Sequence, residues 1–243
     1  MQELRATAEG LQFEDKVVLV AGCGQELSEA TARMLARQGA AGVLLGGRSV
    51  EQGQAIAAII SAAGCEAHFQ PTDLAKLDDC AALTAKADQT FGRVDALIFS
   101  AGMAVPRSHP DAPLEVLDHL HAVNVRAPFA LMHKSAEIMR REGIPGCMLN
   151  LLGLPGPDDL CLNAAYDAVQ SALVSLTASF AAGLAEDGIR VLGLDITAAP
   201  VDPADPRVRL QAIGRAIALL AADPAAAPSG SLVAIDRLLL ARA

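Results

Sequence analysis

Short apolar runs alternate with longer helical patterns along most of the chain, and this alternation constrains the fold more than any other feature. The apolar runs cover residues 16–22, 42–47, 65–71, 93–102, 146–153, 189–197 and 231–236. Helical patterns separate them at 28–40, 75–91, 113–141, 160–186 and 207–222. One more follows the run at 42–47 and ends near Gly64. Apolar strands joined through helices are typical of a parallel sheet that is buried on both faces. Right-handed crossovers then predict an α/β fold, a doubly wound sheet of about seven strands with ligands at the strands' carboxyl ends.

The chain length fits one domain. At 243 residues, without an internal repeat or a linker, we predict a polar tail over residues 1–14 and a single domain over 15–243. The N-terminal stretch is polar and acidic and lacks the charged-then-apolar arrangement of a secretion signal. No apolar run reaches the roughly 18 residues that a membrane span needs. We therefore expect a cytoplasmic protein without a membrane contact.

Charge and cysteine content exclude two further classes. The formal net charge of −9 argues against nucleic-acid binding, which needs clustered Lys and Arg. The cysteines are odd in number and form no CxxC pair, so reduced core or loop thiols fit better than a disulfide framework or a metal site. They are Cys23, Cys65, Cys80, Cys147 and Cys161. We expect no metal ion.

Several short motifs follow one another in a fixed order after residue 14. They read DKVVLVAG, GGRS, TDL, FGRVDALIFSAG, VNVRAPF, a lone tyrosine in a helix (Tyr166) and GIRV. In order and spacing this set resembles the short-chain dehydrogenase/reductase family over nearly the whole chain. The resemblance implies a single Rossmann-type domain and NAD(P) as the family's cofactor. A fold hosts many functions, so each site residue needs its own examination.

The glycine-rich phosphate loop of that family, TGxxxGxG, reads AGCGQELS at residues 21–28. Gly22 is retained, whereas Glu26 and Ser28 replace the other two glycines. Such glycines let the backbone approach a pyrophosphate at the positive end of a helix. Glu26 adds a negative charge there, although an acid in a first helical turn also stabilises the helix by about 0.3–1 kcal/mol. Both interpretations predict weaker dinucleotide binding.

The adenosine side of the site is better retained. By the resemblance, Asp73 matches the aspartate that contacts adenine, and Ala101 with Gly102 partly matches the family's NAG loop. Arg48 resembles the arginine that attracts a 2′-phosphate. Arg48 as a solvated loop cation and Asp73 as a helix N-cap stay open as alternatives. We expect no tightly bound cofactor in this chain, with weak NAD(P) binding at most and NAD held by a partner subunit.

The resemblance also implies a catalytic set of Asn, Ser, Tyr and Lys, which is half absent here. Asn124 and Tyr166 match, but Gly153 replaces the serine and Gln170 the lysine. A cation about 4 Å from a phenol contributes about 4 kcal/mol at a dielectric near 20, which lowers the tyrosine pKa of about 10 by roughly three. Gln170 supplies no such field, and the missing serine removes a donor for a substrate carbonyl. Tyr166 is therefore expected to stay a protonated, weak acid.

The segment after the sixth apolar run lacks features that the family uses in catalysis. The helix at 164–185 and the C-terminal leucines, by contrast, retain surfaces suited to assembly. Ile196 and Thr197 stand where the family has a PG turn, and only residues 198–209 replace its longer substrate flap, so water exclusion is hard to arrange. The helix at 164–185 is small and apolar over much of its circumference, which predicts burial against its own sheet, a partner or both. Leu238–240 form an apolar cluster suited to a partner contact.

The chain lacks catalytic residues of the family but retains surfaces suited to assembly. This combination favours a non-catalytic subunit of a hetero-oligomeric NAD(P)-dependent dehydrogenase. We expect a heterotetramer with a catalytically intact relative. The pattern resembles the inactive subunit of heteromeric 3-hydroxyacyl-CoA-type dehydrogenases, such as the hydroxy(phenyl)methylsuccinyl-CoA dehydrogenase of anaerobic toluene degradation. That implies a hydroxyacyl-CoA-type alcohol as substrate of the complex. Two alternatives stay open: an active enzyme that uses Tyr166 and Asn124 in altered chemistry, and a nucleotide-sensing module.

Overall fold

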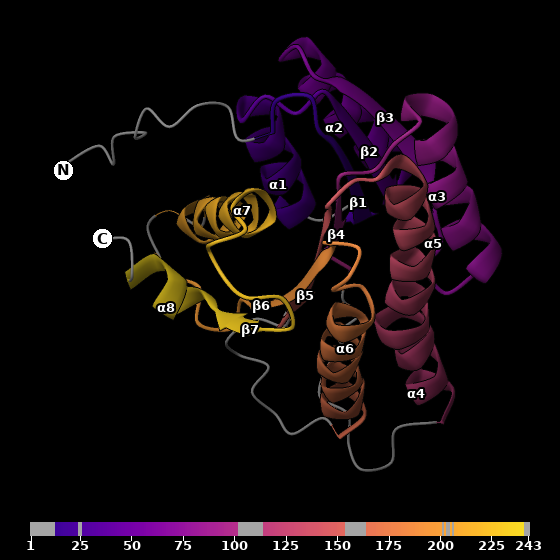
Figure 1. Cartoon of the computed structure of the whole chain (residues 1–243), viewed down its shortest axis with the longest axis vertical. Helices are drawn as coiled ribbons and strands as arrows, with labels where there is room; N and C mark the ends of the chain where they lie inside the picture. Colours follow the sequence, from indigo (N-terminus) through magenta and orange to yellow (C-terminus); the bar gives the residue numbers. More distant parts are fainter. Residues whose placement is uncertain are drawn as a thin grey trace.

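Seven parallel strands form one sheet in the order β3-β2-β1-β4-β5-β6-β7 (Figure 1). The computed structural model describes residues 13–23, 26–101, 114–153, 164–200, 202, 205 and 207–240. The strands are β1 (Val17–Cys23), β2 (Gly42–Gly47), β3 (Glu66–Pro71), β4 (Ala96–Phe99), β5 (Cys147–Leu152), β6 (Arg190–Asp195) and β7 (Leu232–Ala234). The predicted doubly wound parallel sheet is confirmed.

Helices cover both faces of the sheet. They are α1 (Glu26–Arg37), α2 (Val50–Ala62), α3 (Leu77–Phe91), α4 (Leu114–His121), a π-helical segment η1 (Ala122–Arg126), α5 (Ala127–Glu142), α6 (Ala164–Gly183), α7 (Arg207–Ala222) and α8 (Ile235–Leu240). Side chains of α1, α2 and α7 pack with Val18 and Val20 on one face. Those of α3 and α5 pack with Leu19 on the other. Because neighbours along a strand point to opposite faces, the continuous apolar runs fill both cores.

The strand order reverses between β1 and β4, so the topological switch point of the sheet lies at the carboxyl ends of these two strands. The register pairs Ala21 of β1 with Phe99 of β4. Each strand therefore ends at the same edge of the sheet, and the segments after β1 and β4 lie side by side. This carboxyl edge is where a doubly wound fold binds its ligands.

Two predicted elements differ from the observed ones. The helix expected at 113–141 contains the five-residue segment η1, in which the N–H of Ala127 bonds to the carbonyl of Ala122. The strand expected at 231–236 ends at Ala234, and α8 follows. Ile235 and Leu238 are both buried, and their spacing suits one face of a helix, which periodicity cannot distinguish from a strand over so short a run.

The C-terminal leucine cluster has a use within this chain. Leu238 is buried and Leu239 packs against the same core as α1 and α7. The chain's own core therefore buries Leu238 and part of Leu239, and the expected contact of this cluster with a partner stays a prediction. At the other end, Phe13 is fully buried, and residues 1–12 lie outside the described part. No helix among the described residues is long and apolar enough to cross a membrane.

Candidate functional site

The backbones of Gly22 and Ala101 approach each other closely at the carboxyl ends of β1 and β4. Gly22 has a φ of +110°, and a Cβ at this position would lie 2.5 Å from the backbone nitrogen of Ala101. Only glycine fits such an approach of two backbones. The structure thus brings these two predicted site residues together, while Gly102 lies outside the described residues.

Ser28 stands where the family has the third glycine of its phosphate loop. Its side chain is fully buried. Its Oγ donates a hydrogen bond of 2.9 Å to the carbonyl oxygen of Gly22 and lies 3.2 Å from the Oγ of Ser100. Ser100 in turn donates to the carbonyl of Ala21 over 3.2 Å. These bonds join α1 to the ends of β1 and β4, a role for Ser28 and Ser100 that the sequence did not reveal.

Glu26 is the first residue of α1. Its position in the first turn puts a carboxylate-bearing residue at the positive end of that helix. The replacement of glycine at this point therefore adds negative charge to the helix terminus that faces the carboxyl edge. The expected weakening of anion binding there stays a prediction.

Asp73 and Arg48 follow β3 and β2 at the carboxyl edge. Asp73 Oδ1 accepts a hydrogen bond from the N–H of Ala75 over 3.1 Å, and Oδ2 lies 3.7 Å from the Lys76 ammonium. Lys76, not Asp73, is the N-cap of α3, so the N-cap alternative is wrong. Arg48 is exposed and forms no hydrogen bond or ion pair within the described residues. Its guanidinium is available to a ligand or to water.

Asn124 lies inside the π-helical segment η1. It is buried, and its Nδ2 donates a hydrogen bond of 3.0 Å to the carbonyl of Leu120. A single π-helical turn within a longer helix frequently marks a functional site, because the wider turn redirects one side chain. No sequence signal distinguishes such a turn from an ordinary helix, so this feature was missed.

Gly153 and Gln170, which replace the expected serine and lysine, contact each other. The N–H of Gly153 donates a long hydrogen bond of 3.4 Å to Gln170 Oε1. Gln170 stands one turn after Tyr166 in α6, and both side chains are half-buried. Gly153 has a φ of +73°, and a Cβ there would overlap Thr197 Oγ1 and lie 2.9 Å from Asp195 Oδ1. The space for a serine side chain is therefore taken.

The segment after β6 is held by its own contacts. Asp195 Oδ1 accepts a hydrogen bond of 2.9 Å from the N–H of Thr197. Arg209, in the first turn of α7, donates through Nη2 to the carbonyl of Ile196 over 3.1 Å. Asp195 and Arg209 were missed from the sequence, although Asp195 directly precedes the Ile196–Thr197 pair that marks the altered turn. Between Asp195 and Arg207 no helix occurs among the residues that the structure describes.

Three of the cysteines are buried thiols that offer no nucleophile. Cys65, Cys80 and Cys147 are buried and free, as expected. Burial raises the pKa of each of these thiols to about 11. Because the thiolate is the reactive form, they stay inert near neutral pH.

The model of the short chain dehydrogenase family matches residues 16–202. The chain is 32% identical over 254 aligned positions to cis-4-hydroxycyclohexanecarboxylate dehydrogenase of Sinomonas cyclohexanicum, with 93% of this chain and 97% of the relative covered. It is 33% identical over 181 positions to an uncharacterized oxidoreductase of Thermotoga maritima, covering 74% and 70%.

Solved structures agree with the fold. A metagenomic short-chain oxidoreductase in complex with NADP superimposes with a TM-score of 0.79 at 28% identity, covering 92% of this chain and 98% of the other. A short-chain dehydrogenase/reductase from Serratia marcescens gives 0.80 at 25% identity, covering 92% and 97%.

Proposed function

This chain belongs to the short-chain dehydrogenase family, and we propose that it is a non-catalytic member that acts as a subunit beside a catalytically intact relative. The observation that carries this proposal is the contact between Gly153 and Gln170. The positions expected to hold a hydroxyl and a cation instead hold a backbone N–H and a neutral amide, which bond to each other. Position 170, one turn after Tyr166, therefore presents a neutral amide instead of a cation.

The surroundings of Gly153 leave no room for the serine side chain. A serine there would need an L-residue in the left-handed region, which costs roughly 1–2 kcal/mol. Its Cβ would also displace Thr197 and Asp195. Neighbouring side chains have thus settled into the space, so restoring the serine alone would not restore the site.

NAD(P), the cofactor of the family, fits one half of the carboxyl edge better than the other. The metagenomic relative was solved in complex with NADP. Here Arg48 and Asp73 could hold the adenosine end, the former by charge and the latter by hydrogen bonds. At the reacting end, Gln170 is engaged with Gly153 and supplies no charge. We infer weak NAD(P) binding by this chain, without a hydride-transfer step through its residues.

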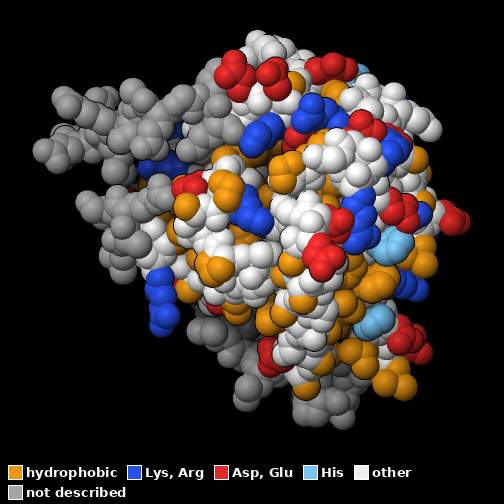
Figure 2. Space-filling view, viewed as in Figure 1, with side chains coloured by type: hydrophobic (Ala, Val, Ile, Leu, Met, Phe, Trp, Pro, Cys, Tyr) orange, Lys and Arg blue, Asp and Glu red, His pale blue; other side chains and the backbone are white. Residues whose placement is uncertain are grey.

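An exposed apolar surface over α4 and α5 supports assembly with a partner. Leu114 is 74% exposed, Leu117 37% and Phe129 47%. The Phe129 ring stacks on His133 and meets Phe180 of α6 edge-on, with centroids 5.4 Å apart in the second pair. Figure 2 shows hydrophobic side chains gathered beside histidines at the lower right, over α4 and α5. Exposed apolar patches of this kind mark interaction sites.

The neighbouring face of α6 carries small side chains at helical spacing. Six of the exposed positions form this row: Ala164, Ala168, Ser171, Ser175, Ala178 and Ala182. They are alternately four and three residues apart, the spacing of a seam between two helices. Small side chains let a second helix approach closely. We propose that the corresponding helices of an intact relative pack here, in a heterotetramer whose partner binds NAD.

The proposed substrate of the complex is a hydroxyacyl-CoA-type alcohol, oxidised by the partner subunit. Support comes from the resemblance to inactive subunits of 3-hydroxyacyl-CoA-type dehydrogenases. The relative from Sinomonas cyclohexanicum acts, by its name, on a hydroxy acid. The proposed complex and this relative would both oxidise a secondary alcohol.

Native mass spectrometry of the protein isolated from its own source tests the proposal. We expect a mixed oligomer with a second short-chain dehydrogenase, and no turnover by the purified chain with NAD or NADP and secondary alcohols. Replacing Tyr166 by Phe should leave the activity of the complex unchanged. Turnover by the chain alone that Tyr166→Phe abolishes would instead establish an active enzyme with altered chemistry.

A nucleotide-sensing module is the second candidate, favoured by the exposed guanidinium of Arg48. Calorimetry with NADP would then give micromolar binding that Arg48→Gln weakens and Lys134→Gln, on the outer face of α5, does not. Absence of binding at millimolar NADP would remove this candidate.

A further inference from the structure

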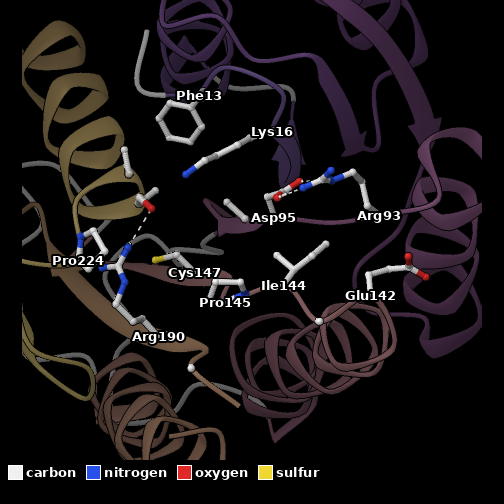
Figure 3. Close-up of a pocket in the computed structure, with 15 residues that line it drawn as sticks. Phe13, Lys16, Arg93, Asp95, Glu142, Ile144, Pro145, Cys147, Arg190 and Pro224 are labelled. Atoms are coloured by element: carbon white, nitrogen blue, oxygen red, sulfur yellow. Dashed lines mark hydrogen bonds and ion pairs between the residues drawn. The ribbon is translucent and has the colours of Figure 1, made fainter. Parts of the chain in front are cut away.

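A cavity of about 700 Å³ opens at the opposite edge of the sheet (Figure 3). It lies among the amino ends of β1, β4, β5 and β6 and between the last turns of α5 and α7. Its size is in the range of small-molecule sites. The carboxyl edge, with Gly153 and Gln170, lies at the other ends of the same strands. Nothing in the proposed function involves this cavity.

Apolar side chains form part of the wall of the cavity, beside its charged residues. Phe13, Ile144, Pro145, Pro224 and Cys147 all line it. Figure 3 shows these side chains around an open centre, with Phe13 above and Pro145 below. Such a lining favours a ligand with a hydrocarbon body, because apolar contact removes its surface from water.

Both carboxylates at the cavity are paired with an arginine, although the arginine that binds Glu142 also binds Asp88. Asp95 Oδ1 and Oδ2 accept two hydrogen bonds from Arg93, of 2.6 and 2.8 Å. Asp95 Oδ2 also accepts from the N–H of Val17 over 2.9 Å. Glu142 Oε1 accepts from the Nε of Arg141 over 2.6 Å. These acids therefore leave the remaining cations of the cavity unmatched.

Arg190 and Lys16 are those remaining cations. Arg190 donates 2.9 Å hydrogen bonds to the carbonyls of Leu220 and Ala221, at the negative end of α7, and forms no ion pair within the described residues. Lys16 is half-buried and has no hydrogen-bond or ion-pair partner for its ammonium in that part of the chain. Figure 3 shows both side chains reaching toward the end of α7.

Both cations line the cavity together with Cys147 of β5. Burial is the larger effect and raises the pKa of the Cys147 thiol to about 11, whereas the charges of Arg190 and Lys16 lower it. An anion in the cavity would meet these two positive charges, neither of which forms an ion pair within the described residues.

We propose that this cavity binds a small organic carboxylate with an apolar body. The carboxylate pairs with the Lys16 ammonium and with the Nε–H and second Nη2–H of Arg190. These two N–H groups are left unused by the carbonyls of Leu220, Ala221 and Asp223. The hydrocarbon lies against the apolar wall formed by Phe13, Ile144 and Pro224. The site is separate from the carboxyl edge, so it serves as a binding or regulatory site whichever function that edge performs.

Calorimetric titration of the full chain with sodium acetate, butyrate and hexanoate, at constant ionic strength, tests the proposal. Affinity should rise by about fourfold for each methylene group that becomes buried. Hexan-1-ol and hexylammonium should bind far more weakly than hexanoate, because they lack the negative charge.

Three variants test separately whether hexanoate binding needs the charge of Lys16 and the open volume of the cavity. Lys16→Gln should weaken hexanoate binding by about tenfold, the effect of losing a charge-assisted hydrogen bond. The matched control Lys76→Gln removes an exposed lysine at the other edge of the sheet and should change nothing. Ala222→Met should fill the cavity and abolish binding with Lys16 intact, which keeps the test valid if Lys16→Gln folds poorly.

The proposal is overturned by three results. Hexan-1-ol binding as tightly as hexanoate would reduce the cavity to an apolar surface. Unchanged hexanoate affinity in Lys16→Gln would remove the proposed ion pair. No saturable heat with hexanoate at tens of millimolar would exclude the site. None of these results bears on assembly or on turnover by a partner.

Discussion

Polar side chains at the two edges of the sheet differ in whether they have partners within the chain. At the carboxyl edge, the residues that replace the expected glycine, serine and lysine bond to neighbours within the chain: Ser28 to Gly22, and Gln170 to Gly153. At the amino edge a cavity stays open, and Lys16 has no partner among the described residues. Internal hydrogen bonds stabilise a fold, whereas unmatched charges beside a cavity favour a ligand. In this chain the altered positions at the carboxyl edge are hydrogen-bonded internally, although Arg48 at the same edge is exposed.

The largest expected effect comes from Gly153→Ser at the carboxyl edge. We expect a loss of roughly 2–4 kcal/mol in the free energy of unfolding, from the left-handed backbone and from overlap with Thr197 and Asp195. Gly92→Ser is the matched control, because Gly92 has a φ of +70° and nothing within 4 Å of an added Cβ. Urea unfolding of both variants measures the difference. Equal losses would mean that the carboxyl edge still has room for a serine.

The second effect is a pH dependence at the amino edge. The folded-state pKa of Cys147, about 11, lies above that of an unfolded cysteine, so its contribution to stability is complete below about pH 9 and is lost as the pH rises toward 11. The free energy of unfolding should fall more steeply over that range in the wild type than in Cys147→Ala. Parallel curves for the two proteins would place the thiol in contact with water.

Ser28→Ala should cost about 1 kcal/mol, since it removes a buried hydrogen bond from the carboxyl edge. Ser175→Ala, on the exposed face of α6, serves as the control and should change stability by far less. Chemical denaturation measures both. A neutral Ser28→Ala would contradict the view that this hydroxyl joins α1 to the strand ends.

The smallest effect is expected for Lys16→Gln in the absence of a ligand. A side chain without a partner contributes little, so the free energy of unfolding should change by less than about 0.5 kcal/mol. Thermal melting against the wild type is sufficient to test this. A large loss would reveal a structural role for Lys16 and weaken the contrast between the two edges.

Most of the fold could be predicted from the sequence because it depends on local pattern. The run at 42–47 coincides with β2, and the helix at 207–222 with α7. The failures have a local cause as well. The π-helical turn at Asn124 changes no residue preference, and the short segment from Ile235 suits a strand or a helix equally well.

Alternating apolar runs specified a doubly wound sheet, and counting along the motifs identified Gly153 and Gln170 as the altered positions. Neither kind of reasoning could foresee that these two residues contact each other, or that Thr197 occupies the space beside Gly153. Those facts depend on the end of β5 meeting α6 and the segment after β6. The cavity at Lys16 likewise arises where four strands begin and two helices end. Sequence pattern reports what each segment buries, whereas contacts between distant segments arise only when the whole chain packs.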